Sequence, residues 1–170
     1  MIDVVEWGYD GGNLGMEQDV AEFVERVKSD FWNLRIREGK KFMFRPPKTV
    51  VYEKNVFWGE EGSCKGGSGE KVVVEYKMQL LHELGHALLE HNFFATDLER
   101  IKMERAAWDQ ARALGERYGV EWDEEVVEEK LDTYRDWLHQ RSKCKQCGMT
   151  GYQTKDGVYH CPFCEGGQER

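Results

Sequence analysis

The sequence predicts an α+β protein in two parts, a helix-rich domain in residues 1–142 and a small cysteine-rich module in residues 143–170. Three observations lead to this prediction. Apolar residues recur at helical spacing in several long stretches, and short β-rich runs lie between them. Four of the five cysteines form two C-x-x-C pairs near the C-terminus. A chain of 170 residues suffices for one domain with a proper core and a small appendage.

The composition limits the partners and the compartment that we expect. The chain carries 32 acidic and 24 basic side chains, and its formal net charge of −8 argues against a general binder of nucleic acid or of anionic membranes. The first residues lack the basic and apolar regions of a signal peptide, and no apolar run approaches the roughly 18 residues that span a bilayer. We therefore expect an intracellular, cytoplasmic protein with no membrane partner.

Strand and helix patterns alternate in the N-terminal third. Residues 2–7 predict a short strand that a Gly-rich turn closes, and residues 16–36 carry apolar side chains at helical spacing. Two β-rich runs follow at residues 41–45 and 49–52, with two prolines between them. These runs predict neighbouring strands of a small sheet.

A loop and then a strand are predicted before the central helix. Residues 55–58 extend the preceding strand or add another, and residues 60–70 have the Gly and Ser content of a flexible loop. Residues 71–76 (Lys-Val-Val-Val-Glu-Tyr) predict a strand that leads into the helix. If this strand lay at a sheet edge it would pair with an extended peptide, and if it lay in the interior it would only support the sheet.

Two further helices are predicted in the second half. Thr96-Asp97-Leu98-Glu99 has the pattern of a capping box, and the helix that it begins runs to about Tyr118, where Gly119 ends it. Residues 122–139 form the next helix, and the acidic residues at its start suit the positive end of the helix dipole.

The stretch His82-Glu83-Leu84-Gly85-His86 carries the strongest chemical signal in the chain. Two histidines four residues apart project from one face of a helix, so their imidazoles can occupy two corners of a tetrahedral zinc site. Glu83 follows the first histidine directly, and its carboxylate can act as general base on a water that the metal activates. The neighbouring residues are otherwise uncharged, and polar groups in such an apolar wall need a partner. The alternative is an ordinary buried helix whose histidines only form hydrogen bonds.

A catalytic zinc site needs a third protein ligand, and Glu104 is the best candidate. Glu104 shares a helical stripe with Ile101, Trp108 and Ala111, and a carboxylate in an inward-facing apolar stripe needs a cation. Glu99 is the competitor, but its place in the capping box gives it a simpler role.

Other assignments fit the sequence less well. A salt bridge to Arg100 or Arg105 is the alternative role for Glu104. His91 lies five residues after His86, a poor reach for the same helix face, and His139 has no metal-ligand context. The metzincin pattern requires Gly and His where this chain has Leu89 and Asn92, which excludes that class.

The two motifs together resemble a known family. H-E-L-G-H at residues 82–86, followed by Glu104-x-x-Ala107-Trp108-x-x-Ala111, is similar to the ImmA/IrrE-type zinc metallopeptidases and their phage-encoded relatives. Matched position by position, the resemblance implies that His82, His86 and Glu104 bind zinc and that Glu83 is the general base. It also implies a zincin-like domain in residues 1–142, with the active-site helix packed on a short mixed or antiparallel sheet.

The resemblance covers about residues 71–115, and the chain departs from the family pattern inside it. Ala106 replaces a second acidic residue, Trp108 stands where Asn is usual, and Gln110 replaces Phe. Members of the resembled family cleave repressor or regulator proteins in bacterial and phage systems. The departures affect the expected substrate more than the expected metal.

The C-terminal cysteines predict a second, structural zinc site. Two C-x-x-C pairs each form a knuckle, and four thiolates complete a closed tetrahedral site; the residues are Cys144, Cys147, Cys161 and Cys164. The D-G turn at Asp156-Gly157 between two short β-rich runs predicts a hairpin, so we expect a zinc ribbon rather than two separate redox pairs. Zinc is thus the expected cofactor twice, once catalytic and once structural.

The role of this module and that of the fifth cysteine are less determined. Residues 143–170 carry almost no net positive charge, which gives weak support for nucleic-acid binding, although aromatic side chains there could stack on bases. We expect protein contact or substrate presentation first, and DNA binding behind it. Cys64 lies in the Gly/Ser-rich loop, where it is either an ordinary thiol or a thiolate that swings onto the catalytic zinc.

Three functions follow from these motifs. The first is an intracellular zinc-dependent endopeptidase that acts on a protein or peptide substrate. The second is a SprT-like, DNA-associated protease, although that family uses a third histidine as ligand. The third is a zinc-stabilised binding protein without catalysis. For an enzyme, a donor to the developing oxyanion is also expected, and the sequence leaves Tyr76, Asn92, Tyr118 and others open.

Overall fold

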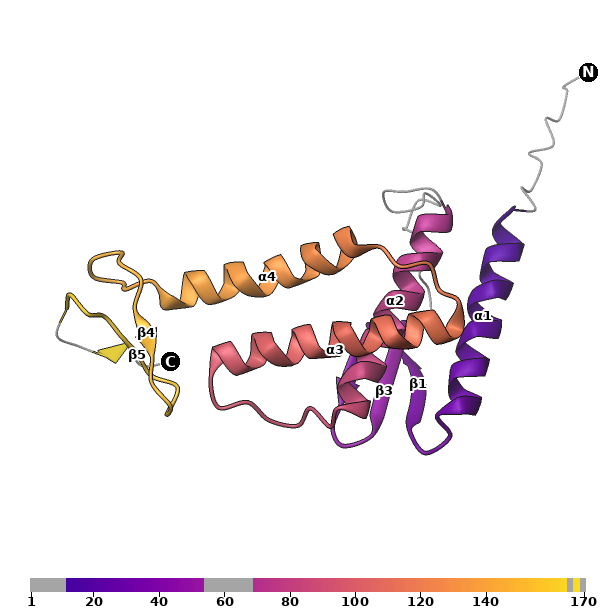
Figure 1. Cartoon of the computed structure of the whole chain (residues 1–170), viewed down its shortest axis with the longest axis horizontal. Helices are drawn as coiled ribbons and strands as arrows, with labels where there is room; N and C mark the ends of the chain where they lie inside the picture. The colour runs from indigo at the N-terminus through magenta and orange to yellow at the C-terminus, as the bar shows by residue number, and fades with distance from the viewer. Residues whose placement is uncertain (1–11, 54–68, 165–166, 169–170) are drawn as a thin grey trace, which may run out of the picture.

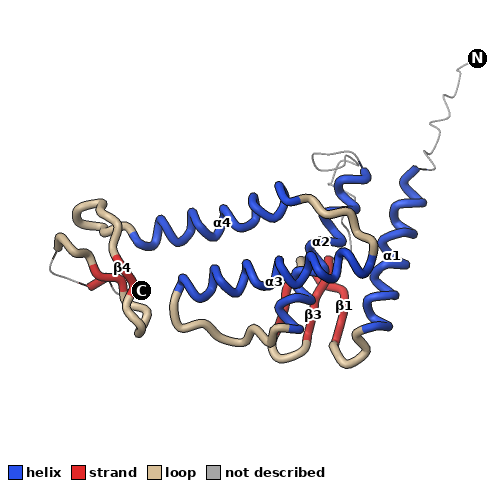
Figure 2. Tube along the Cα trace, in the orientation of Figure 1, coloured by secondary structure: helices blue, strands red, loops and turns tan. Residues whose placement is uncertain are grey.

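The protein has an α+β fold in which helices pack on a small mixed sheet (Figures 1 and 2). The computed structural model describes residues 12–53, 69–164 and 167–168. The helices are α1 (Gly12–Asp30), α2 (Gly69–Leu88), α3 (Asp97–Tyr118) and α4 (Glu124–Ser142). The strands are β1 (Arg35–Gly39), β2 (Met43–Arg45), β3 (Thr49–Glu53), β4 (Tyr152–Gln153), β5 (Tyr159–His160) and β6 (Gly167–Gln168).

The first three strands form a mixed sheet in the order β1-β3-β2. The central strand β3 pairs parallel with β1 and antiparallel with β2, so β2 lies at an edge. Val50, Val51 and Tyr52 of β3 are buried, as expected for a central strand covered by helices. Apolar side chains of α1, α2 and α3 complete a continuous core with β3.

Helices α2 and α3 cross at very close range (Figure 1). A Cβ atom placed on Gly85 of α2 would lie only 2.5 Å from the backbone carbonyl oxygen of Ala107 in α3. Any side chain at position 85 would therefore push the two helices apart. The glycine of the H-E-L-G-H stretch sets the distance between the helix that carries the histidines and the helix that carries Glu104.

The predicted ends of α3 are confirmed. The Thr96 hydroxyl accepts a hydrogen bond from the backbone N–H of Glu99, and the Glu99 carboxylate accepts one from the backbone N–H of Thr96. Gly119 ends the helix in the left-handed conformation with φ of 68°. The next helix, α4, begins at the N-cap Asp123 and continues to Ser142, three residues beyond its predicted end.

Asp97, in the first turn of α3, joins the cysteine module to the helices. Its carboxylate is only 2% exposed and accepts hydrogen bonds from Arg141 Nε at 2.7 Å and from the Tyr159 hydroxyl at 2.9 Å. Its backbone N–H donates to the side-chain oxygen of Gln153 at 2.7 Å. The module thus contacts α3 where α4 ends, at one end of the molecule (Figure 1).

Two predictions of secondary structure are wrong. Residues 71–76 are not a strand but belong to α2, because Val73, Tyr76 and Leu80 are buried at helical spacing and this packing overrides the β-preference of three consecutive valines. The first helix ends at Asp30 instead of near residue 36, and Arg35–Gly39 is the strand β1. Its largely exposed, charged side chains gave no strand pattern, since pairing with β3 determines its conformation.

Several predictions lie outside the described residues. These are the strand at 2–7, the strand at 55–58, most of the loop at 60–70, and Cys64. The division into domains at residues 142 and 143 stays a prediction. No helix within the described ranges is long and apolar enough to cross a membrane.

Replacing Gly85 with alanine tests the helix crossing. Although alanine favours helix formation by up to about 1 kcal/mol over glycine, the contact with Ala107 is expected to reduce the free energy of unfolding by about 1–3 kcal/mol net. Urea unfolding followed by circular dichroism measures the change. Gly15→Ala in α1 is the matched control, because its Cβ would meet nothing within 4 Å, and it should be neutral or stabilising. A Gly85→Ala protein as stable as wild type would contradict the role of this crossing.

Candidate metal centres

Three predicted ligands meet at the crossing of α2 and α3. His82 Nε2 and His86 Nε2 lie 3.1 Å apart, and the Glu104 Oε2 atom lies 3.3 Å from the first and 3.2 Å from the second. His82 and Glu104 are buried and His86 is nearly so. The helix spacing places both histidines on one face of α2, and the Gly85–Ala107 contact brings α3 close enough for Glu104 to complete the group.

The spacing of these three atoms fits a zinc ion. An ion with tetrahedral ligands at about 2.0–2.1 Å holds neighbouring ligand atoms about 3.3 Å apart. The three observed separations of 3.1, 3.2 and 3.3 Å agree with that edge length. One cation between the two imidazole nitrogens and the carboxylate oxygen would accept a lone pair from each of the three atoms.

The electrostatics of Glu104 favour a cation at this place. Burial would raise the pKa of Glu104, but hydrogen bonds from His82 and His86 outweigh it and lower the pKa to about 2. The carboxylate is therefore ionised at neutral pH. Arg105, the alternative partner considered from the sequence, instead contacts Asp109 at 3.6 Å and Glu128 at 2.9 Å.

His91 contacts the opposite side of the His86 ring. The two Nδ1 atoms lie 2.8 Å apart, so one of them donates a hydrogen bond to the other. Burial, together with the neighbouring His86, lowers the pKa of His91 and keeps its ring neutral and able to accept. If His86 donates from Nδ1, its Nε2 atom carries a lone pair toward Glu104 and His82, as a metal ligand must. The five-residue spacing from His86 argues against His91 as a metal ligand but does not predict this contact.

Trp108 supports the other histidine. Its ring stacks on His82 with centroids 4.2 Å apart and planes 24° apart. This is the position where the resembled family carries Asn. The stacking restricts the orientation of the His82 ring, whose Nδ1 atom has no hydrogen-bond partner among the described residues. Trp108 thus orients this ligand by packing where a hydrogen bond is absent.

A pocket of about 430 Å³ opens onto the triad. Its walls come from β2 with the preceding residues, from the segment 91–94, and from α2, α3 and α4. Glu83 lines this pocket beside His82 and Glu104, and the Gln79 amide donates a hydrogen bond to its carboxylate at 3.2 Å. The general-base candidate and the three ligand candidates therefore share one cavity.

Tyr134 of α4 supplies a hydroxyl group that is not among the donors predicted from the sequence. It lines the same pocket, and burial and the neighbouring Glu104 raise the pKa of Tyr134 to about 12, so the hydroxyl stays protonated. Of the donors considered from the sequence, Asn92 also lines the pocket. Tyr76 donates to the Glu53 carbonyl and Tyr118 to the Asp30 carboxylate, and neither lines it. Tyr134 follows Val127 and Leu131 on the inward face of α4, a pattern that could have identified it.

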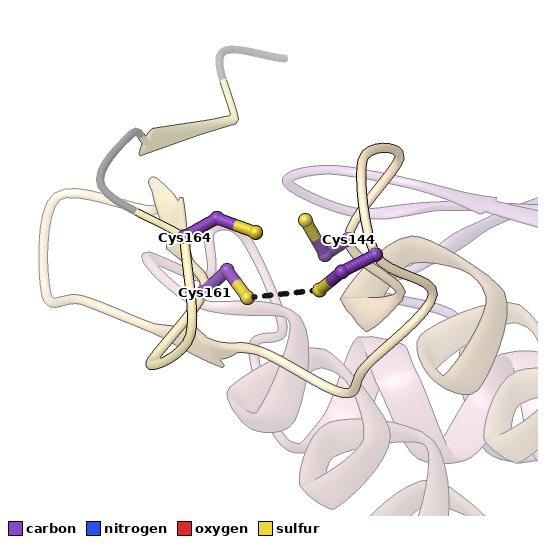
Figure 3. Close-up of side chains that lie close together, drawn as sticks. Cys144, Cys161 and Cys164 are labelled. Atoms are coloured by element: carbon purple, nitrogen blue, oxygen red, sulfur yellow. Dashed lines mark hydrogen bonds between the residues drawn. The ribbon is translucent and has the colours of Figure 1, made fainter.

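The four C-terminal cysteines form the second cluster. Their sulfur atoms all lie within 4.8 Å of one another, and Figure 3 shows the side chains of Cys144, Cys161 and Cys164 turned toward a common centre. Cys147 Sγ and Cys161 Sγ are 3.5 Å apart, close to the ~3.8 Å edge of a tetrahedral site with four zinc–sulfur bonds. The predicted hairpin is confirmed, since β4 and β5 pair antiparallel and Gly157 turns with φ of 83°.

The thiol groups of this cluster cannot all ionise without a cation. The backbone N–H groups of Cys147 and Gln146 lower the pKa of Cys144 to about 6. The neighbouring sulfurs, chiefly that of Cys147, raise the pKa of Cys164 to about 12. A divalent metal ion removes this repulsion and lets all four sulfurs act as thiolates.

Metal analysis of the purified chain tests both centres. We expect two zinc ions per chain, one lost in His82→Ala and the other lost in Cys147→Ala, because each change removes a ligand from one cluster. Inductively coupled plasma mass spectrometry gives the ratio of metal to protein. His139→Ala is the control, since His139 is exposed and belongs to neither cluster. A wild-type chain that keeps fewer than two zinc ions in excess metal would contradict the assignment.

Comparison of the chain with protein-family models, curated proteins and solved structures found no match. The described residues therefore provide two candidate metal sites, the His82–His86–Glu104 triad and the four-cysteine cluster, as the basis for a function.

Proposed function

We propose that the protein is a zinc-dependent endopeptidase with Glu83 as its general base. The proposed zinc ligands are the triad of His82, His86 and Glu104. The observation that carries this proposal is the near-tetrahedral spacing of the triad in the same pocket as Glu83. The ImmA/IrrE-type metallopeptidases, whose motifs the sequence resembles, combine the same residue types at the same spacing.

The pocket residues have separate roles in peptide hydrolysis. A zinc ion held by the triad would supply Lewis acidity for the attacking water and for the substrate carbonyl. The Glu83 carboxylate accepts the proton of the water and passes it to the leaving amine. The Tyr134 hydroxyl donates a hydrogen bond to the carbonyl oxygen as that atom gains negative charge.

The position of β2 supports a peptide substrate. This strand is a sheet edge, and Met43 and Phe44 line the pocket. An extended peptide can pair with such an edge and present its backbone to the triad. Residues 71–76, predicted as a strand that could pair with a peptide, are helical, so β2 is the proposed peptide-binding edge instead.

A catalytic site agrees better with the pocket than a purely structural zinc does. Structural zinc sites are closed by four protein ligands, whereas the triad groups three donors among the described residues and faces a pocket. The third donor is a carboxylate, which also argues against the SprT-like alternative with its third histidine. The four-cysteine cluster has the closed composition of a structural site, and we assign it the folding of the C-terminal module.

The Glu83→Gln variant tests the role of the general base. Glutamine keeps the size of the side chain but cannot accept the proton, so cleavage should fall at least about a thousandfold while the zinc content stays at the wild-type value. Zinc-loaded protein is incubated with a library of synthetic peptides, and products are measured by mass spectrometry. If Glu83→Gln cleaves as fast as wild type, the proposed mechanism is wrong.

The Tyr134→Phe variant tests the oxyanion donor. Loss of one hydroxyl donor should lower kcat about a hundredfold with little change in KM or zinc content. Tyr118→Phe is the matched control, because that hydroxyl also contacts a carboxylate but lies away from the pocket, and its kcat should equal that of wild type. If Tyr134→Phe had the same kcat as Tyr118→Phe, Tyr134 would not be the oxyanion donor.

A further inference from the structure

Arg100 of α3 lines the pocket and is surrounded by aromatic rings. Its guanidinium carbon lies 5.5 Å from the ring centre of Phe94, 5.4 Å from that of Tyr134 and 4.8 Å from that of Trp137. The side chain is half-buried. Rings of this kind stabilise the charge and fix the plane of a guanidinium group, and they leave the N–H groups at its edge available.

A second arginine that packs on the same tryptophan has a carboxylate partner, whereas Arg100 has none among the described residues. The Arg141 guanidinium lies 4.9 Å from the Trp137 ring, and its Nε donates to the buried Asp97 carboxylate at 2.7 Å. Within the described part of the chain, Arg100 forms no ion pair with a carboxylate. Although Arg100 and Glu104 are four residues apart on α3, Glu104 Oε2 faces the two histidines.

We propose that Arg100 is a carboxylate-binding residue of this pocket. It would select peptides that carry a carboxylate near the scissile bond, either on an acidic side chain or at a free C-terminus. The planar fork of a guanidinium group matches a carboxylate with two parallel hydrogen bonds. A pocket wall that shields part of such a contact from solvent strengthens it compared with one on an open surface.

The other charges of the pocket permit an anionic substrate at this position. Glu104 faces the two histidines and is assigned to the metal, and Lys41 adds a second cation to the pocket wall. The acidic side chains that line the pocket are Glu83 and Glu104, and the metal assigned to Glu104 would offset the charge of that carboxylate. The inference deepens the proposed function, because it concerns the substrate of the same site.

The test separates binding from cleavage. Matched synthetic peptides are made with Asp or Glu at each position or with Asn or Gln in its place, and each is made with a free and an amidated C-terminus. For binding, zinc-loaded full-length protein with Glu83→Gln is immobilised, and retained peptides are quantified by mass spectrometry. For cleavage, the same peptides are given to zinc-loaded protein with Glu83 intact. Both arms compare three proteins: one with Arg100 intact, one with Arg100→Gln and one with Arg105→Gln.

We expect the retained amount and the cleavage rate of acidic or free-carboxylate peptides to be at least about tenfold higher than those of their amide partners. Arg100→Gln should reduce this ratio about tenfold. Arg105→Gln is the control, because Arg105 is exposed on the same helix, pairs with Glu128 and lies outside the pocket. It should keep the wild-type ratio. Arg100→Lys keeps the positive charge but loses the planar guanidinium group, so its acid-to-amide ratio should lie between those of wild type and Arg100→Gln. It replaces Arg100→Gln if that variant does not fold.

The outcomes distinguish this inference from the proposed function. If peptides are cleaved but the acid-to-amide ratio does not depend on Arg100 in either arm, the carboxylate site is wrong and the peptidase stands. If no peptide is cleaved but retention of acidic peptides depends on Arg100, the peptidase is wrong and the carboxylate site stands. The free and amidated termini show whether a side chain or the chain end supplies the carboxylate.

Discussion

The contact between Gly85 and Ala107 is the constraint on which the functional site depends. The histidines and Glu83 lie on α2, and Glu104 lies on α3, so no local sequence pattern brings them together. The crossing places the backbones in direct contact and leaves the three ligand atoms 3.1–3.3 Å apart. Since a metal ligand displaced by even 1 Å loses its geometry, the missing side chain of Gly85 matters as much as the presence of the ligands.

Both candidate metal centres follow the same electrostatic logic. Each gathers groups that are costly to bury without a cation, two imidazoles and a carboxylate in one case and four thiols in the other. They differ in access, because the triad faces a pocket whereas the cysteines face one another. This difference in access is the reason to propose catalysis for the triad and a structural role for the cysteine cluster.

The sequence predicted the parts whose pattern is local. The H-E-x-x-H face, the capping box at Thr96 and the D-G turn of the hairpin each depend on residues close together in the chain, and the structure has all three. It did not predict β1, whose conformation comes from pairing with β3, or the helical start of α2, where burial outweighs the preference of valines for strands. The contact of His86 with His91 needed the fold, because the five-residue spacing of the two histidines does not predict it.

Asp97 gives the cysteine module a thermodynamic link to the pocket. Its buried carboxylate accepts hydrogen bonds from Arg141 and Tyr159, and Tyr159 belongs to a short hairpin beside the cysteine cluster, a kind of module that a bound metal commonly stabilises. If the cysteine cluster binds a metal, loss of that metal is expected to expose this carboxylate and loosen the first turn of α3, the helix that carries both Arg100 and Glu104. Metal occupancy of the cysteine cluster would thereby be coupled to the order of the pocket, and the two parts of the chain would then unfold together.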